Sequence, residues 1–272
     1  MITSLRNQRI KSLAALKTSR GRKEQRLAIA EGIHLADEAL RSGWRVTALL
    51  LSASARLRPE VGHLREMANH RKVEIVEMAD DCYRRISDLL SPEGVAVTVA
   101  TASTEIDPLI ASGDARLLVA AGIQDPGNAG ALVRTAEAAG ASACLFLGGV
   151  DLWSPKFLRA AMGSSFRLPC AAATAAAFLD LAKQHRLRIR AAISPRSSAA
   201  SPLPSTDFEH ADYRPPVAIC LGGEGAGLSS EITAAAEVIS VPMAGAVESL
   251  NVAVAAGIIL YAARRQWQVY CS

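Results

Sequence analysis

Long apolar runs, a signal-peptide core and aromatic residues are scarce or missing in this chain of 272 residues. No uninterrupted apolar stretch reaches about 18 residues, the length that a membrane-spanning helix needs. The first residues, MITSLRNQRIKSL, lack the apolar region of a signal peptide. We therefore expect a cytoplasmic protein with no membrane partner. Aromatic residues make up only 4% of a chain that is 50% hydrophobic, so its core consists mainly of Ala, Leu, Val and Ile.

The cysteines are few, scattered and without a Cys-x-x-Cys pair, which argues against a zinc site and a redox dithiol. Cys144 and Cys220 stand in strand-like runs, where a free thiol usually serves as a small buried side chain. No set of His, Cys and acidic residues has metal-ligand spacing, and we predict a reaction without a metal ion. The five cysteines are Cys82, Cys144, Cys170, Cys220 and Cys271.

Positive charge is concentrated at the start of the chain. Residues 1–26 hold eight Lys or Arg and one Glu, whereas from residue 106 onward 13 basic residues balance 13 acidic ones. A basic arm on a neutral body is typical of a protein that contacts RNA phosphates. The alternative is a solvated, poorly ordered segment. The candidate phosphate contacts are Arg6, Arg9, Lys11, Arg20, Arg22 and Lys23.

Apolar runs alternate with helical patterns in two series. After a basic amphipathic helix, the first series forms a small α/β domain within residues 1–100, and residues 101–115 have the composition of a linker. Residues 116–272 restart the alternation with buried-looking strands separated by helices, which predicts an α/β fold with a largely parallel sheet covered on both faces. Strands are expected at 116–123, 143–148, 188–193, 217–223 and 238–243, and helices at 128–139, 155–162, 174–185, 229–236 and 248–265.

Ligands of such sheets lie beyond the carboxyl ends of the strands, and three loops with unusual chemistry leave strands there. In the first, residues 125–127 form a turn, Asn128 is a candidate N-cap, and Arg134 lies within two helical turns. Arg134 is either a surface residue of an alanine-rich helix or a group that reaches back over the strand ends. In the third loop, Ser249 and Asn251 stand at the mouth of a long apolar helix, either as N-caps or as part of a site.

The second loop, LGGEGAGLSSE, places four glycines around Glu224. Glycine permits positive φ and lets the backbone approach a ligand closely. A dinucleotide fingerprint starting at Gly223 would need glycine at 228, where Leu228 stands, so a nicotinamide-dependent oxidoreductase is disfavoured. A plain tight turn remains open.

The three loops together resemble the motifs of the SpoU/TrmH family of RNA 2′-O-ribose methyltransferases. The matching segments are Asn128-x-Gly130-x-x-x-Arg134, Leu221–Leu228 and Val241–Val252, in that order, and the resemblance spans about 115–265. The first hundred residues resemble, more weakly, the small RNA-binding domain of family members that act on ribosomal RNA.

This resemblance implies a SPOUT α/β domain with a trefoil knot, a homodimer, S-adenosylmethionine as cofactor and ribosomal RNA as partner. It implies that Arg134 is the central catalytic residue, acting as the base. Because a guanidinium does not ordinarily accept a proton, we expect instead that Arg134 positions a phosphate and stabilises alkoxide charge, while water or a phosphate oxygen takes the proton. Asn128 and Glu224 would hold Arg134 and the loops, with Ser249 and Asn251 on the substrate side. The cofactor would bind around Leu221, Gly222, Gly223, Val241, Met243 and Leu250.

Two other functions remain open at this point. A transfer-RNA 2′-O-methyltransferase would use the same motifs, although the N-terminal domain favours ribosomal RNA. A non-catalytic RNA-binding factor of ribosome assembly could retain the same fold, but the intact polar motif residues argue against it.

Overall fold

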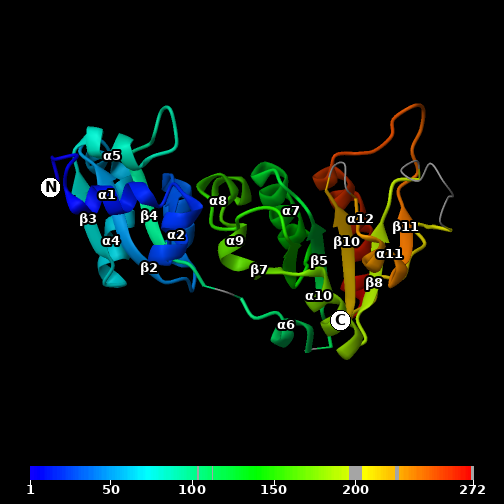
Figure 1. The fold of residues 1–272 in the computed structure, drawn as a ribbon. Coiled ribbons are helices and arrows are strands. Elements are labelled where there is room, and N and C mark those ends of the chain that lie inside the picture. Colours follow the sequence, from blue (N-terminus) through cyan, green and yellow to red (C-terminus); the bar gives the residue numbers. More distant parts are fainter. Residues whose placement is uncertain (103, 112, 196–203, 224–226, 271–272) are drawn as a thin grey trace. The chain divides into compact units, whose positions relative to one another are not determined.

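The structure, a computed structural model, describes residues 1–102, 104–111, 113–195, 204–223 and 227–270, with side chains described up to residue 268. Contacts divide the chain into two units. The N-terminal unit comprises Met1–Ala102 and Asp151–Arg167, and the C-terminal unit comprises Ser103–Val150 and Leu168–Ser272. Each is an α/β unit with its own sheet (Figure 1). Within the described residues, no helix is long and apolar enough to cross a membrane.

The N-terminal unit has a four-stranded sheet in the order β1-β4-β2-β3. Strand β4 is antiparallel to both of its neighbours, and β2 is parallel to β3. The strands are β1 (Leu27–Glu31), β2 (Val46–Ser52), β3 (Glu74–Met78) and β4 (Val95–Ala100). Helices α3 (Ile33–Arg41) and α4 (Pro59–His70), the short η1 (Ala55–Leu57) and helix α5 (Asp80–Ile86) complete this part. Ile2 pairs with Met78 and covers the open edge of β3.

The basic arm is ordered. It forms two helices, α1 (Gln8–Ala15) and α2 (Ser19–Gln25), instead of the single helix expected, because Thr18 caps a new helix start. Ile10, Leu13 and Leu16 are buried in a core that α1 shares with α5 and one face of the sheet. The interpretation of the arm as a poorly ordered tail is therefore wrong.

A segment of the second half of the chain belongs to the N-terminal unit. Residues 151–167, with α8 (Pro155–Ala161) and α9 (Ser164–Arg167), pack there, although residues 116–272 were expected to form one domain. The Trp44 ring contacts Trp153 edge-on at 5.0 Å between centroids, and its indole N–H donates to the Phe166 carbonyl at 3.0 Å. These aromatic contacts explain why the segment leaves the sheet to which its neighbours in sequence belong.

The C-terminal unit has a seven-stranded sheet in the order β7-β6-β5-β10-β8-β11-β9, in which every neighbouring pair is parallel. This confirms the predicted parallel sheet. Two strands were not predicted, β7 and β9, because they are short and weakly apolar. The strands are β5 (Arg116–Ala121), β6 (Ala143–Leu147), β7 (Cys170–Ala173), β8 (Arg188–Ala192), β9 (Thr206–Asp207), β10 (Val217–Gly222) and β11 (Glu237–Ser240).

Helices cover both faces of this sheet, as expected. Helices α6 (Asp107–Ala111), α10 (Ala175–Gln184) and α11 (Ser230–Ala234) share a core with alternate residues of β5, β6 and β10. Helices α7 (Pro126–Ala139) and α12 (Val252–Tyr270) pack against each other and against the sheet. Helix α6 lies in the segment that was expected to be an unstructured linker. Cys82, Cys144 and Cys220 are free and buried, as predicted, whereas Cys170 is free but only half-buried. Cys271 lies outside the described residues.

Candidate functional site

The three motif loops start from one edge of the C-terminal sheet. At that edge the last residue of β5, Ala121, pairs with Gly222 of β10 and Leu147 of β6. Ala192 of β8 pairs with Leu221 and with Ile239. Because all these strands are parallel, the segments that follow them leave from the same side of the sheet. Residues far apart in the sequence thus meet at the carboxyl edge.

Helix α7, which carries the first motif, is capped by Asp125. The Asp125 carboxylate accepts a hydrogen bond from the Asn128 N–H at 2.8 Å, and Pro126 takes the first helical position. The expectation that Asn128 is the N-cap is therefore wrong by three residues. Proline at the first position needs no hydrogen-bond acceptor, so the cap naturally precedes it. Asn128 lies in the first turn, with its side chain left for another partner.

That partner is Asn251 of the third motif. The Asn251 Nδ2 donates to Asn128 Oδ1 at 3.1 Å, while Asn251 Oδ1 accepts from the N–H groups of Ala253 and Val254 at 3.0 and 3.4 Å. Asn251 therefore caps α12 and also joins it to α7. The N-cap interpretation of Asn251 is confirmed, and the same carboxamide can also reach the first motif because it carries both a donor and an acceptor.

Helices α7 and α12 run side by side in the same direction. Their contacts advance together along both helices, from Asn128 with Asn251 to Ala138, whose carbonyl accepts from Arg264 at 3.2 Å. Between them, a Cβ placed on Gly257 would lie 3.7 Å from Thr135 Cγ2. Both N-termini thus lie at one place, where free N–H groups and the helix dipoles favour negative charge.

Arg134 lies one turn and a half beyond Asn128 on α7, with an exposed side chain. Its guanidinium makes no hydrogen bond or ion pair with any residue that the structure describes. Ser249 is also exposed, and Glu224 lies outside the described residues, so its predicted contact with Arg134 stays a prediction. An exposed guanidinium with no partner among the described residues suits an anionic substrate with several oxygens.

The glycine loop after β10 doubles back on itself. The Gly223 N–H donates to the Ala121 carbonyl at 2.8 Å, and the Gly227 N–H donates to the Gly223 carbonyl at 3.1 Å. A Cβ on Gly222 would lie 2.5 Å from the Gly227 oxygen and 2.6 Å from the Leu228 nitrogen. These contacts bring Gly227 and Leu228 back against Gly222 and Gly223. Because no side chain fits here, the loop presents peptide groups, which can recognise the edge of a base or a ribose hydroxyl.

The third motif loop, between β11 and α12, is held at both ends. Ser240, the last residue of β11, accepts from the Phe208 N–H at 3.0 Å, and the Ser194 hydroxyl donates to the Glu248 carbonyl. Sequence reasoning missed Ser194, since nothing local marks a serine whose partner lies 54 residues further on. Val241, Met243 and Leu250 in this loop are half-buried, whereas Leu221 is buried in β10.

The predicted RNA contacts divide into three groups. Arg6, Lys11 and Lys23 are exposed. Two others are exposed but paired with carboxylates, Arg9 with Glu74 at 2.6 Å and Arg20 with Glu24 at 2.7 Å. Arg22 is only 5% exposed and is bonded within the N-terminal unit, so it is not a phosphate contact in this structure.

Cysteine chemistry plays no part at this edge. Burial raises the pKa of the Cys220 thiol far above its usual range, and burial together with neighbouring Cys170 raises the pKa of Cys144. Both thiols stay protonated and unreactive at neutral pH. Neither thiol is therefore a candidate reacting group, and the exposed polar residues of the three loops remain the candidates.

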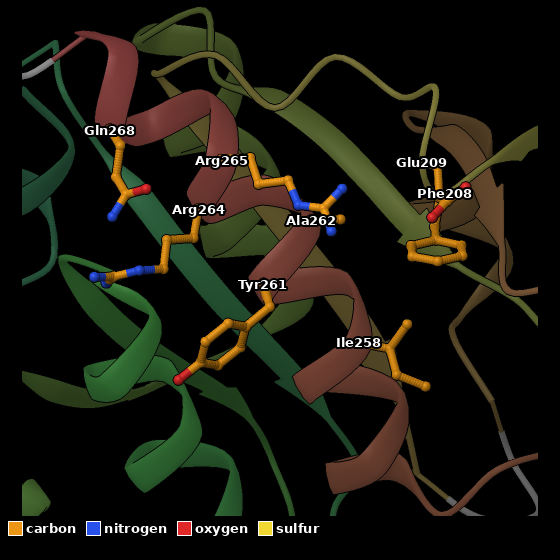
Figure 2. A pocket seen from close by; sticks show the side chains of 8 residues that line it. All are labelled: Phe208, Glu209, Ile258, Tyr261, Ala262, Arg264, Arg265 and Gln268. Carbon is orange, nitrogen blue, oxygen red and sulfur yellow. The ribbon is translucent and has the colours of Figure 1, made fainter.

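A cavity of about 410 Å³ lies elsewhere on the C-terminal unit, along α12 (Figure 2). It contains none of the predicted site residues. Its walls combine two aromatic rings with two arginines, and the lining residues are Phe208, Glu209, Ile258, Tyr261, Ala262, Arg264, Arg265 and Gln268.

A parallel α/β sheet with three motif loops at its carboxyl edge defines a methyltransferase of the SPOUT type. The family model described as SpoU rRNA Methylase family matches residues 115–261, and the chain belongs to this family. A second model, the MRM3-like substrate binding domain, matches residues 7–97.

Similar proteins cover nearly the whole chain. An uncharacterized tRNA/rRNA methyltransferase of Synechocystis is 33% identical, over 97% of this chain and 93% of the relative. The 23S rRNA (guanosine(2553)-2′-O)-methyltransferase RlmP of Bacillus subtilis is 28% identical, over 96% and 97%. The crystal structure of an AdoMet-bound rRNA methyltransferase from Sinorhizobium meliloti is 30% identical, covers 97% of each chain and has a TM-score of 0.85.

Proposed function

We propose that this protein transfers a methyl group from S-adenosylmethionine to a ribose 2′-hydroxyl of ribosomal RNA. The observation that carries the proposal is the bond between Asn128 and Asn251, which joins the first and third motifs at the N-termini of two parallel helices. The activities for which two relatives are named, 2′-O-methylation of 23S rRNA, support the same reaction and substrate.

The cofactor fits the chemistry of the two loops that would hold it. Peptide groups of Leu221–Gly223 and of the loop with Val241, Met243 and Leu250 would bind its adenosine. The side-chain-free turn at Gly222 supports this placement. When bound, S-adenosylmethionine supplies an electrophilic methyl group.

Arg134 acts on the RNA. A guanidinium stays protonated in proteins, so Arg134 serves as a fixed cation that holds a phosphate and stabilises charge developing on the ribose oxygen. The proton of the ribose hydroxyl goes to water or to a phosphate oxygen. Asn128 and Asn251 fix the start of α7 and so set the position of Arg134. Ser249 contacts the substrate, and Glu224 holds Arg134. The exposed cations Arg6, Lys11 and Lys23 bind RNA phosphates, with Arg9 and Arg20 exchanging their carboxylate partners for phosphates.

Three further properties belong to this proposal. The late strand β10 lies between β5 and β8, which supports a C-terminal chain threaded through a trefoil knot. Val254 and Tyr261, each 52% exposed on one side of α12, support a homodimer through this helix, with the cavity of Figure 2 beside the contact. Sedimentation equilibrium tests the dimer. A ribosomal RNA substrate implies the cytoplasm as the place of action.

Methylation of RNA by the purified full chain tests the function. We expect labelled methyl groups in ribosomal RNA, at a ribose position found by mapping 2′-O-methyl sites with and without the protein. Incorporation into transfer RNA alone would change the assigned substrate. RNA binding without any incorporation would support the non-catalytic assembly factor instead.

Arg134→Ala should lower the single-turnover rate by about 100-fold or more, as removal of a preorganised donor does. Arg134→Lys should recover part of the rate, because it keeps the charge but loses the planar fork. If Arg134 were the base, the lysine variant would instead keep its activity with a pH optimum displaced downward. Lys183→Ala, which removes an exposed cation of α10, is the control. Full activity of Arg134→Ala would refute the assignment.

A further inference from the structure

Arg22 is buried in the middle of the basic arm, although the basic residues near it in the sequence are candidate RNA contacts. Its Nη1 donates to the carbonyl oxygens of Leu16 and Lys17 at 2.8 and 3.0 Å. Its Nη2 donates to Asp151 Oδ2 at 2.6 Å. One guanidinium therefore ties the turn between α1 and α2 to a residue 129 positions further along the chain.

Asp151 is the first residue of the segment that packs in the N-terminal unit. Its other carboxylate oxygen accepts from the Trp153 N–H at 2.9 Å, and its carbonyl accepts from the Ser154 N–H at 3.0 Å. Burial opposes the charge on Asp151, but the hydrogen bonds from Arg22 and Trp153 outweigh it and hold its pKa below the usual range. The pair is thus a charge-assisted bond, which is among the stronger polar contacts of a protein.

Two residues before Asp151, the chain still belongs to the C-terminal unit and packs against the first motif loop. Gly149 has a φ of +89°, and a Cβ there would lie 2.9 and 3.0 Å from backbone atoms of Ile123. The Gly122 N–H donates to the Leu147 carbonyl at 3.1 Å. Ile123 is two residues before Asp125, the cap of α7. Only Val150 separates the residue that contacts this loop from the residue that Arg22 holds.

We propose that Arg22 is a positioning residue for methyl transfer, which acts through Asp151 on the segment that supports the start of α7. The inference rests on the proposed function, in which the N-terminal unit holds RNA and α7 carries Arg134. Methyl transfer requires the ribose and the reacting groups to be aligned, and a displacement of about 1 Å can lower a rate about 100-fold. Arg22 therefore affects alignment and leaves the binding of RNA and of cofactor unchanged.

Asp151→Asn, Arg22→Ala and Arg22→Lys in the full chain test this role. For each, we would measure the Kd for S-adenosylmethionine, the Kd for ribosomal RNA and the single-turnover rate with both saturating. For Asp151→Asn, which leaves the bonds from Arg22 to Leu16 and Lys17 in place, we expect both Kd values within about 2-fold of the wild type. We expect a rate lower by about 10-fold or more for Asp151→Asn and Arg22→Ala. Arg22→Lys, which keeps the charge, should recover part of the rate.

Arg41→Ala is the matched control, since Arg41 also pairs with an aspartate, Asp37, at 2.7 Å, but on the exposed side of α3. It should change none of the three quantities. Near-ultraviolet circular dichroism of Trp44 and Trp153 reports whether the variants are folded. Asp151→Asn keeps the size and one acceptor oxygen of the side chain. If an Arg22 variant misfolds, the rate of Asp151→Asn therefore tests the role of the pair.

Each other outcome counts against the inference. Weaker RNA binding with a normal rate at saturation would make Arg22 an RNA contact, and loss of the tryptophan signal in every variant would make the pair a purely structural support. If the wild type is active and the folded Asp151→Asn variant methylates RNA at the normal rate, this inference is overturned while the proposed function stands. A wild type that methylates no RNA would overturn the proposed function and this inference with it.

Discussion

Replacing Gly222 by alanine adds one methyl group at the point where the glycine loop folds back on β10. The new Cβ would lie 2.5 and 2.6 Å from backbone atoms of residues 227 and 228, against at least 3.4 Å in an ordinary contact. The Gly227 carbonyl carbon would lie closer still, and none of these atoms belongs to a flexible side chain, so this part of the loop must move by more than about 1 Å. Such overpacking costs about 1–3 kcal/mol. If the displaced peptide groups hold the cofactor, its affinity should fall between about 5-fold and about 150-fold.

Isothermal titration with S-adenosylmethionine measures this loss, and thermal unfolding shows whether the variant is folded. Gly257→Ala is the matched control in the same unit, because its Cβ would make an ordinary 3.7 Å contact with Thr135. Alanine also favours the helix there by about 1 kcal/mol. The control should bind the cofactor as the wild type does. An unchanged affinity in folded Gly222→Ala would refute the placement of the cofactor against this turn.

Two further predictions concern the N-terminal unit. Replacing both Lys11 and Lys23 by alanine should reduce the slope of log K against log salt for RNA binding by about 0.7 to 0.9 per lost phosphate contact. Filter binding at several salt concentrations measures this slope. An unchanged slope would show that these lysines do not contact RNA phosphates. Because the folded-state pKa of Asp151 is lowered, its ion pair with Arg22 stabilises the fold above the unfolded pKa of about 3.9 and loses this contribution as pH falls through the lower folded value. Urea unfolding between pH 6 and pH 3 should therefore depend less on pH in Asp151→Asn than in the wild type, and equal dependence would contradict this account of the pair.

The elements of the fold were largely predictable, because strands and helices leave a local period in the sequence. The apolar runs predicted β5, β6, β8 and β10 to within two residues of the observed ends. The order and spacing of the motifs placed Asn128 and Asn251 at one site, and their side chains form a hydrogen bond. Here a local pattern was sufficient, since parallel strands bring their following loops to one edge.

The sequence did not reveal contacts that depend on distant residues. In the sequence, Arg22 does not differ from its exposed neighbours in a run of basic residues. Its buried position depends on an ion pair with Asp151, which lies far along the chain. The start of α7 was predicted three residues too late for a local reason. The capping residue Asp125 precedes Pro126, and this pair resembled part of a turn in the sequence. The short strand β9 pairs over two residues only, too few for any alternation to be visible.

The return of residues 151–167 to the N-terminal unit has a consequence for biosynthesis. A ribosome adds about 5–20 residues per second, so this segment emerges roughly 3 to 13 seconds after residue 102. During that interval the nascent chain has the strands β1–β4 but lacks α8, whose Arg159 approaches Glu31 of β1 at 3.9 Å in the finished protein. The β1 edge and Trp44 are then uncovered, and exposed strand edges are sites of aggregation. Strand β1 therefore lacks the helix that packs against it until a much later part of the chain has been made.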